Sequence, residues 1–105
     1  MSDKTFSNQL DGAQLERLSI LMEEMGEALQ VIGKIQRHGY DSSHPDNPQT
    51  NNRELLEKEL GHVLTAIEIM SENADMSESR IFSAGRDKLI TIKRWLHFDH
   101  LIPGS

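Results

Sequence analysis

Residues 15–37 read LERLSILMEEMGEALQVIGKIQR, and this stretch decides the fold. Its apolar side chains recur at steps of three or four residues, as they do on one face of an amphipathic α-helix. The predicted apolar face consists of Leu15, Leu18, Met22, Met25, Leu29, Ile32 and Ile35. The helix should begin after Asp11, which is a suitable N-cap. It should end near Arg37, because Gly39 favours a left-handed C-cap conformation.

A second helix is predicted from Asn51 or Asn52 to Glu72, with apolar residues at similar spacing. Its inward face should consist of Leu56, Leu60, Val63, Ile67 and Met70. Residues 40–50 between the two helices contain two prolines and several turn-forming residues, so they predict a loop. This loop is long for a connection between helices, and loops of that kind are often functional.

A third helix is predicted from about Met76 to Phe98. Asp75 and Glu78 have the spacing of a capping box at its start. Its inward side chains should be Ile81, Leu89, Ile92 and Leu96. No segment alternates between apolar and polar residues as a strand would. The predicted class is therefore all-α, with an antiparallel helical hairpin followed by a third long helix.

Length and composition narrow the range of possible functions. The 105 residues predict a single domain, with a core over about 11–98 and loose ends at 1–10 and 99–105. The formal net charge of −6 argues against a nucleic-acid partner, which would require a basic face. The absence of cysteine excludes disulfides and thiolate metal sites. No apolar run approaches the ~20 residues that span a bilayer, so we expect a soluble, cytoplasmic protein without a membrane partner.

Two groups of ionisable residues lie at helical spacing within the first two predicted helices. The first group contains Glu23, Glu24 and Glu27, and the second contains Glu59 with His62 three residues later. Like charges this close on one helix repel each other and destabilise it. Because carboxylate oxygens are the ligands that hard divalent cations prefer, the grouping indicates a metal site.

The two groups should meet across the hairpin. Glu27 lies ten residues before the predicted end of the first helix, which is roughly 15 Å along its axis. Glu59 lies roughly 11 Å after the start of the second helix, so the groups are nearly level. Gly26 and Gly61 lie one in each group, and a glycine inside a helix costs ~1 kcal/mol relative to alanine. They indicate either a close approach of the helices or room for a ligand.

This pattern resembles the E-E-x-x-E…E-x-x-D signature of the MazG-like all-α nucleoside triphosphate pyrophosphohydrolases. The resemblance covers about residues 15–98 and includes LM at 21–22 and LGHVL at 60–64. The sequence RHGY at 37–40 is most similar to the short, single-domain members found in phages. The spacing between the two motifs is longer than is usual in that family, and we assign the excess to the 40–50 loop.

The resemblance implies hydrolysis of a (deoxy)nucleoside triphosphate to the monophosphate and pyrophosphate, with Mg²⁺ as cofactor or with Mn²⁺ or a softer divalent ion. The implied metal ligands are Glu24, Glu27, Glu59 and His62. Glu23 would position or deprotonate the attacking water. Family members are dimers or tetramers, which implies a homo-oligomer with four-helix-bundle-like packing. The implied location is the cytoplasm of a bacterium or of a phage-infected host cell.

One position departs from the family pattern, because His62 stands where the family has an aspartate. Imidazole carries no negative charge and is a softer ligand than a carboxylate. Three outcomes stay open. His62 ligates a softer ion and activity is retained, or it acts through water while the three glutamates hold Mg²⁺. In the third outcome the site is weakened, and the protein is a catalytically degenerate nucleotide or metal binder.

Basic side chains must meet the outer phosphates of such a substrate, since the acidic groups would repel a bare triphosphate. Lys34 and Arg37 follow the first group on the same helix, and Lys88 lies on the third. We predict these three as substrate-binding residues. The aromatic side chains available as a wall for the base are Tyr40, Trp95 and Phe98, from the same chain or from a neighbouring subunit.

Overall fold

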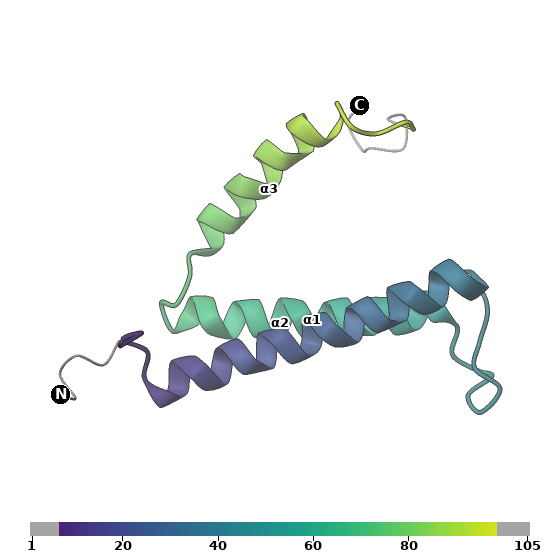
Figure 1. Ribbon diagram of the computed structural model, residues 1–105, viewed down its shortest axis with the longest axis horizontal. Helices are drawn as coiled ribbons and strands as arrows, with labels where there is room; N and C mark the ends of the chain where they lie inside the picture. The colour runs from purple at the N-terminus through teal and green to yellow at the C-terminus, as the bar shows by residue number, and fades with distance from the viewer. Residues whose placement is uncertain (1–6, 99–105) are drawn as a thin grey trace. The chain divides into compact units, whose positions relative to one another are not determined.

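The computed structural model describes residues 7–98, and within them the chain is all-α (Figure 1). The helices in order are α1 (Gly12–His38), α2 (Asn52–Glu72) and α3 (Glu78–Ile92). The described residues contain no strand, only an isolated antiparallel bridge between Ser43 and Asn51. In the same range, no helix combines the length and the apolarity that crossing a membrane requires. Most of the two predicted loose ends, residues 1–6 and 99–105, lies outside the described range.

The chain divides into two compact units, Met1–Asp75 and Met76–Ser105. In the first unit, α1 and α2 lie side by side in opposite directions and form the predicted antiparallel hairpin (Figure 1). The second unit contains α3.

Capping boxes start both helices of the hairpin. The Asp11 carboxylate accepts a hydrogen bond from the Gln14 amide at 2.8 Å, and the Gln14 side chain accepts one from the Asp11 amide at 2.9 Å. Asn51 and Glu54 exchange the same two bonds at the start of α2, at 2.9 and 3.0 Å. Each box satisfies two amides that have no partner within the helix. The predicted starts of both helices are therefore confirmed.

Gly39 ends α1 and turns the chain, as predicted. Its φ of 89° lies in the region that favours glycine, whereas its ψ of 168° is extended rather than left-handed helical. Its amide donates to the Ile35 carbonyl at 2.7 Å and closes the last turn of the helix. The predicted stop is confirmed, and the predicted conformation is correct only in the sign of φ.

The contact between α1 and α2 follows a seam of buried and half-buried side chains that repeats every three or four residues. On α1 the seam consists of Gln14, Arg17, Leu21, Glu24, Ala28, Val31 and Ile35. On α2 it consists of Asn52, Leu56, Glu59, Val63, Ala66 and Met70. Only Ala28, Val31, Ala66 and Met70 are buried apolar residues among those that the structure describes. Glu24 and Glu59 thus occupy seam positions at which an apolar side chain is usual.

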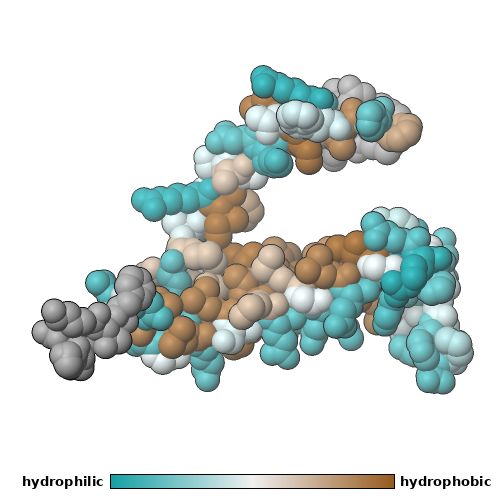
Figure 2. Space-filling view, viewed as in Figure 1, coloured by the Kyte–Doolittle hydropathy of each residue, from teal (hydrophilic) through white to brown (hydrophobic). Residues whose placement is uncertain are grey.

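The prediction for the inward face of α1 is wrong, because most of the predicted apolar residues are not the ones that pack on α2. Most of the predicted face is exposed, and Met22 and Leu29 keep 69 % and 67 % of their surface. Apolar residues surround much of α1, so periodicity alone does not select the side that meets α2. On α2 the predicted face holds except at Leu60, which is exposed. Figure 2 shows hydrophobic side chains gathered along the surface of the hairpin.

The predicted capping box at the start of α3 is not formed. Ser77 is the N-cap instead, and its hydroxyl accepts a hydrogen bond from the Arg80 amide at 3.3 Å. The Asp75 carboxylate accepts two hydrogen bonds from Arg17, so it is not available to cap the helix. As a result, α3 begins at Glu78, two positions after the predicted start at Met76.

The third helix is also shorter than predicted, since it ends at Ile92 rather than near Phe98. The amides of Arg94 and Trp95 donate to carbonyls three residues back, so the chain continues in tight turns. A β-branched run at 90–92 lowers the helix propensity at this point. Within the described residues no member of α3 is buried, and the inward positions predicted for this helix are not confirmed.

Candidate metal centre

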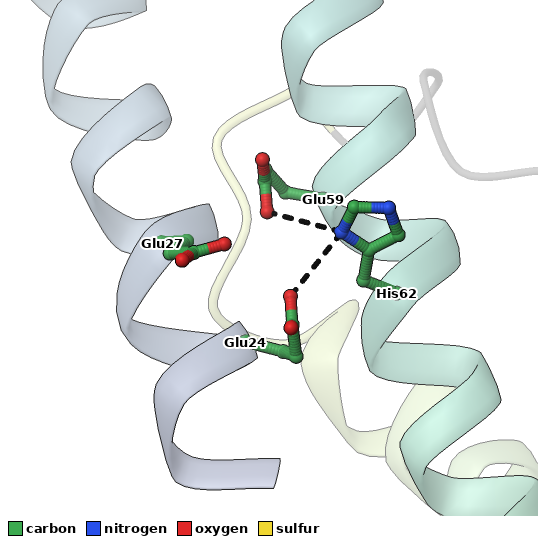
Figure 3. A group of neighbouring side chains, drawn as sticks. All are labelled: Glu24, Glu27, Glu59 and His62. Carbon is green, nitrogen blue, oxygen red and sulfur yellow. Dashed lines mark ion pairs between the residues drawn. The ribbon is translucent and has the colours of Figure 1, made fainter. Parts of the chain in front are cut away.

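Four of the predicted site residues lie together between the two helices of the hairpin (Figure 3). Glu24 and Glu27 come from α1, and Glu59 and His62 come from α2. Each offers one ligand atom, a carboxylate oxygen or an imidazole nitrogen, and these atoms all lie within 4.8 Å of one another. The spacing of three residues places both members of a pair on one side of their helix. The structure therefore brings together the four residues that were predicted as metal ligands; we call them the acidic cluster.

The acidic cluster is buried toward the seam and open toward solvent. The side chains of Glu24 and Glu59 are 22 % and 11 % exposed, whereas that of His62 is 50 % exposed. The imidazole Nδ1 lies 3.2 Å from Glu24 Oε2 and 3.5 Å from Glu59 Oε2, as the dashed lines in Figure 3 mark. His62 thus joins two carboxylates that belong to different helices.

The two seam carboxylates lack full compensation. Glu24 Oε2 and Glu59 Oε2 are buried, and neither has a hydrogen-bond partner within residues 7–98. The imidazole is within ion-pair distance of both oxygens but in hydrogen-bond geometry with neither. Lys58 Nζ lies 3.9 Å from the other oxygen of Glu59. Because a buried carboxylate without a partner costs free energy, this set of donors fits a cation bound between the helices.

The donor types define a class of ion rather than one ion. Three carboxylates suit Mg²⁺ and Mn²⁺, which prefer oxygen ligands. One imidazole extends the range toward Zn²⁺ and other softer divalent ions. Chemically, a divalent ion held here could polarise a phosphate oxygen at the solvent-exposed side of the hairpin.

Glu23 does not belong to the acidic cluster. It is exposed and precedes Glu24 by one residue, which turns it about 100° around α1. Its predicted role with an attacking water stays a prediction. A Cβ atom added at Gly26 or Gly61 would meet no atom within 4 Å, so these glycines do not mark a close approach of the two helices. The alternative, room for a ligand, is the interpretation that remains.

The predicted substrate-binding residues fall into two places. Lys34 and Arg37 line a pocket of about 370 Å³ at the loop end of the hairpin. Lys88 is exposed on α3, in the other unit, and its predicted role stays a prediction. The pocket also contains loop residues that the sequence did not single out, among them Ser42, Ser43 and His44.

The described contacts do not bring the three predicted aromatic side chains together beside the acidic cluster. Tyr40 lies under the Arg53 guanidinium, whose carbon is 4.9 Å from the ring centre, so this ring supports the loop. Trp95 is 79 % exposed, and Phe98 is also exposed; both lie in the other unit.

A half-buried ion pair that the sequence did not reveal closes the far end of the seam. Arg17 donates from Nε to Asp75 Oδ2 at 2.6 Å and from a terminal nitrogen to Asp75 Oδ1 at 3.0 Å. These hydrogen bonds hold the pKa of the Asp75 carboxyl below its ordinary value and raise the pKa of Arg17. The sequence offered no signal for this pair, because the two residues lie 58 positions apart in the chain. The pair ties the segment after α2 to the start of α1.

Comparison with known proteins gives no assignment: no family model, no curated protein and no solved structure matches this chain. The resemblance to MazG-like pyrophosphohydrolases therefore stays a prediction that rests on the two motifs.

Proposed function

We propose that this protein is a metal-dependent hydrolase that converts a (deoxy)nucleoside triphosphate into the monophosphate and pyrophosphate. The observation that carries the proposal is the convergence of Glu24, Glu27, Glu59 and His62, whose ligand atoms lie within 4.8 Å of one another. Two of these residues occupy seam positions where charge is costly, which supports a bound cation over a solvated acidic surface. The reaction itself follows from the resemblance of the two motifs.

In this proposal the acidic cluster holds the divalent ion, which supplies charge to polarise a phosphoryl oxygen and to lower the pKa of water. Glu24 and Glu59 are fixed by the seam, so they hold their positions without rearrangement. Glu23, exposed beside Glu24, accepts the proton of the water that attacks the α-phosphorus. Pyrophosphate then leaves with the electron pair of the broken bond to oxygen. Most of the catalysis is positioning and charge stabilisation.

We also propose that the active form is a homo-oligomer, a dimer or a tetramer with four-helix-bundle-like packing. Large apolar side chains of the hairpin, Met22, Leu29 and Leu64 among them, keep about two thirds of their surface. The seam buries few apolar residues, and a small domain with so little core gains stability from further packing. Sedimentation equilibrium tests this point: a monomer at all concentrations would contradict it.

His62 favours a second candidate function, a catalytically degenerate protein that binds a nucleotide or a metal without turnover. The imidazole replaces the negative charge of the family's aspartate while it contacts Glu24 and Glu59 at 3.2 and 3.5 Å. The variant His62→Asp separates the two functions. A gain in turnover of about tenfold or more would indicate a degenerate site, whereas a loss would indicate that the histidine takes part in catalysis.

The test of the proposed function is an assay of pyrophosphate release over a panel of ribo- and deoxyribonucleoside triphosphates. Each nucleotide is assayed with Mg²⁺, Mn²⁺, Co²⁺ and Zn²⁺, and with EDTA as the metal-free control. We expect release of pyrophosphate with at least one ion and none with EDTA. Absence of turnover with every ion, in wild type and in His62→Asp, would contradict hydrolysis.

A further inference from the structure

The loop end of the hairpin contains a pocket, which we call the basic pocket. Its volume is about 370 Å³, within the range of small-molecule sites. The lining residues include Lys34, Arg37, Ser42, Ser43, His44 and Asn52. They come from the end of α1, from the loop and from the start of α2. This lining includes two cations, two histidines and two hydroxyls, and no carboxylate.

The two cations of the basic pocket lack an ion-pair partner among the described residues. Over residues 7–98, neither Lys34 nor Arg37 forms an ion pair or a side-chain hydrogen bond, whereas Arg17, Arg53 and Lys58 are all paired. Unpaired cations beside a cavity in a chain of net charge −6 favour an anionic ligand.

His44 adds a hydrogen-bond donor from the loop. Its Nδ1 accepts the Asp46 amide at 3.0 Å, so the neutral imidazole carries its proton on Nε2. That proton is free for an acceptor such as a phosphate oxygen. The Asp46 carboxylate, whose Oδ2 lies 3.7 Å from Nδ1, is 93 % exposed.

The loop is held in place by contacts with the start of α2. The Asn52 amide donates to the Ser42 carbonyl at 2.9 Å, and the Asn52 side chain donates to the Gly39 carbonyl at 3.1 Å. The Arg53 amide donates to the Tyr40 carbonyl at 3.0 Å. These bonds use the first amides of α2, so an anion in the pocket would be held by side chains rather than by the helix N-terminus.

The basic pocket and the acidic cluster lie in one line along the hairpin. Lys34 follows Glu27 by seven residues, and Asn52 precedes Glu59 by seven residues. Seven residues are roughly two turns, so each pair shares a helix face and is separated by roughly 10 Å along the axis. A ligand that is anionic at one end and requires a metal at the other would span both sites.

We infer that the basic pocket binds the β- and γ-phosphates of the triphosphate, while the α-phosphorus lies at the acidic cluster. This inference rests on the proposed function. It adds a phosphate-binding site, which is formed in part by the 40–50 loop. It predicts a preference for triphosphates over monophosphates, because only a triphosphate reaches the pocket with its terminal charges.

The test is a binding experiment with inorganic pyrophosphate and the metal-free protein in EDTA. The affinity is measured by isothermal titration calorimetry. We expect saturable binding by wild type and a loss of about tenfold or more in affinity for Lys34→Ala/Arg37→Ala, since each lost bond involves a charge. His44→Ala should weaken binding by about threefold, as expected for one neutral hydrogen bond. Arg80→Ala/Arg86→Ala, which removes two exposed arginines of α3, is the charge-matched control and should bind as wild type does. A circular dichroism spectrum checks that each variant is folded.

Two results would overturn the inference. One is the absence of pyrophosphate binding by wild type, and the other is equal affinity in wild type and the double variant. Either can occur while nucleotides are still hydrolysed, in which case the proposed function stands and the pocket assignment falls. Conversely, pyrophosphate binding that requires Lys34 and Arg37, in a protein that releases no pyrophosphate from any nucleotide, would support the pocket and contradict hydrolysis.

Discussion

The acidic cluster and the basic pocket lie about two helical turns apart on the same hairpin, yet they are built in different ways. Glu24 and Glu59 are seam residues, so the packing of α1 against α2 fixes them. The basic pocket takes Ser42, Ser43 and His44 from a loop, and it depends on hydrogen bonds to the start of α2. The acidic cluster therefore takes its geometry from helix periodicity, and the basic pocket takes its geometry from hydrogen bonds between the loop and the start of α2. Changes at each should therefore have separable effects.

The largest expected effect is on metal-dependent turnover, when a carboxylate is removed from the acidic cluster. Glu59→Gln should lower metal-dependent turnover by about 100-fold or more, since even partners outside the first shell of a metal typically contribute ~10–100-fold. Its matched control is Glu57→Gln, which removes the same charge from an exposed position two residues away. Steady-state pyrophosphate release measures both. Equal losses in the two variants would show that net charge, not the site, matters.

The next effect concerns stability without metal. Glu59→Leu should raise the free energy of unfolding in EDTA by about 1–4 kcal/mol, because it replaces a buried, poorly compensated charge with an apolar residue. Ala66→Leu, on the same seam two turns later, should lower it by about 1–3 kcal/mol through overpacking. Urea titrations measure both changes. A fall in stability for Glu59→Leu would contradict the assignment of Glu59 as a costly seam residue.

A smaller effect on stability should distinguish a glycine at the start of the loop from a glycine inside a helix. Gly39→Ala should cost about 1–2 kcal/mol, because alanine disfavours a φ of 89° while its Cβ would meet no atom within 4 Å. Gly61→Ala, inside α2, should instead gain about 1 kcal/mol from helix propensity. Thermal unfolding of the two variants gives the comparison. A shift of the unfolding midpoint in the same direction for both variants would contradict this expectation.

The smallest effect is expected at the Arg17–Asp75 pair and depends on pH. The pKa of Asp75 is lowered in the folded protein, so its contribution to stability is present above the ordinary carboxyl pKa of about 4 and is lost as the pH falls further. The difference in urea midpoint between wild type and Asp75→Asn should thus be largest near neutrality and shrink below about pH 4.

The control for that pair is Asp41→Asn, which breaks an equally short ion pair with Arg53 on the exposed surface. Exposed pairs contribute little, so its midpoint should stay close to that of wild type at every pH. A difference for Asp75→Asn that does not change with pH would assign its effect to packing rather than to charge.

The sequence predicted the helical class, the starts of both hairpin helices and the four residues of the acidic cluster. It could do so because an i,i+3 pair stays on one side of any α-helix, and residues at similar distances from the connecting loop lie nearly level in an antiparallel hairpin. It did not predict which side of α1 meets α2. Leu and Met suggested one side, but the small residues Ala28 and Ala66 form the contact, and no periodicity in an apolar-rich helix distinguishes the two.

The basic pocket was predicted only in its helical part, through Lys34 and Arg37. The loop residues take their positions from the bonds of Asn52 to Gly39 and Ser42, which join residues at least ten apart in the chain. Propensity describes neighbours in sequence, so it predicted a loop there and not its shape. In the same way, the bonds of Asp75 with Arg17, 58 residues away, override its local preference to cap α3.

The most direct test of the acidic cluster as a metal centre is thermal unfolding during titration with Mn²⁺, in wild type and in Glu24→Gln/Glu59→Gln. We predict that saturating Mn²⁺ raises the stability of wild type by about 2–3 kcal/mol at ~100 times the dissociation constant and leaves the double variant unchanged. An unfolding midpoint of wild type that stays constant with Mn²⁺ and Mg²⁺, or one that rises equally in both proteins, would contradict a cation bound between α1 and α2.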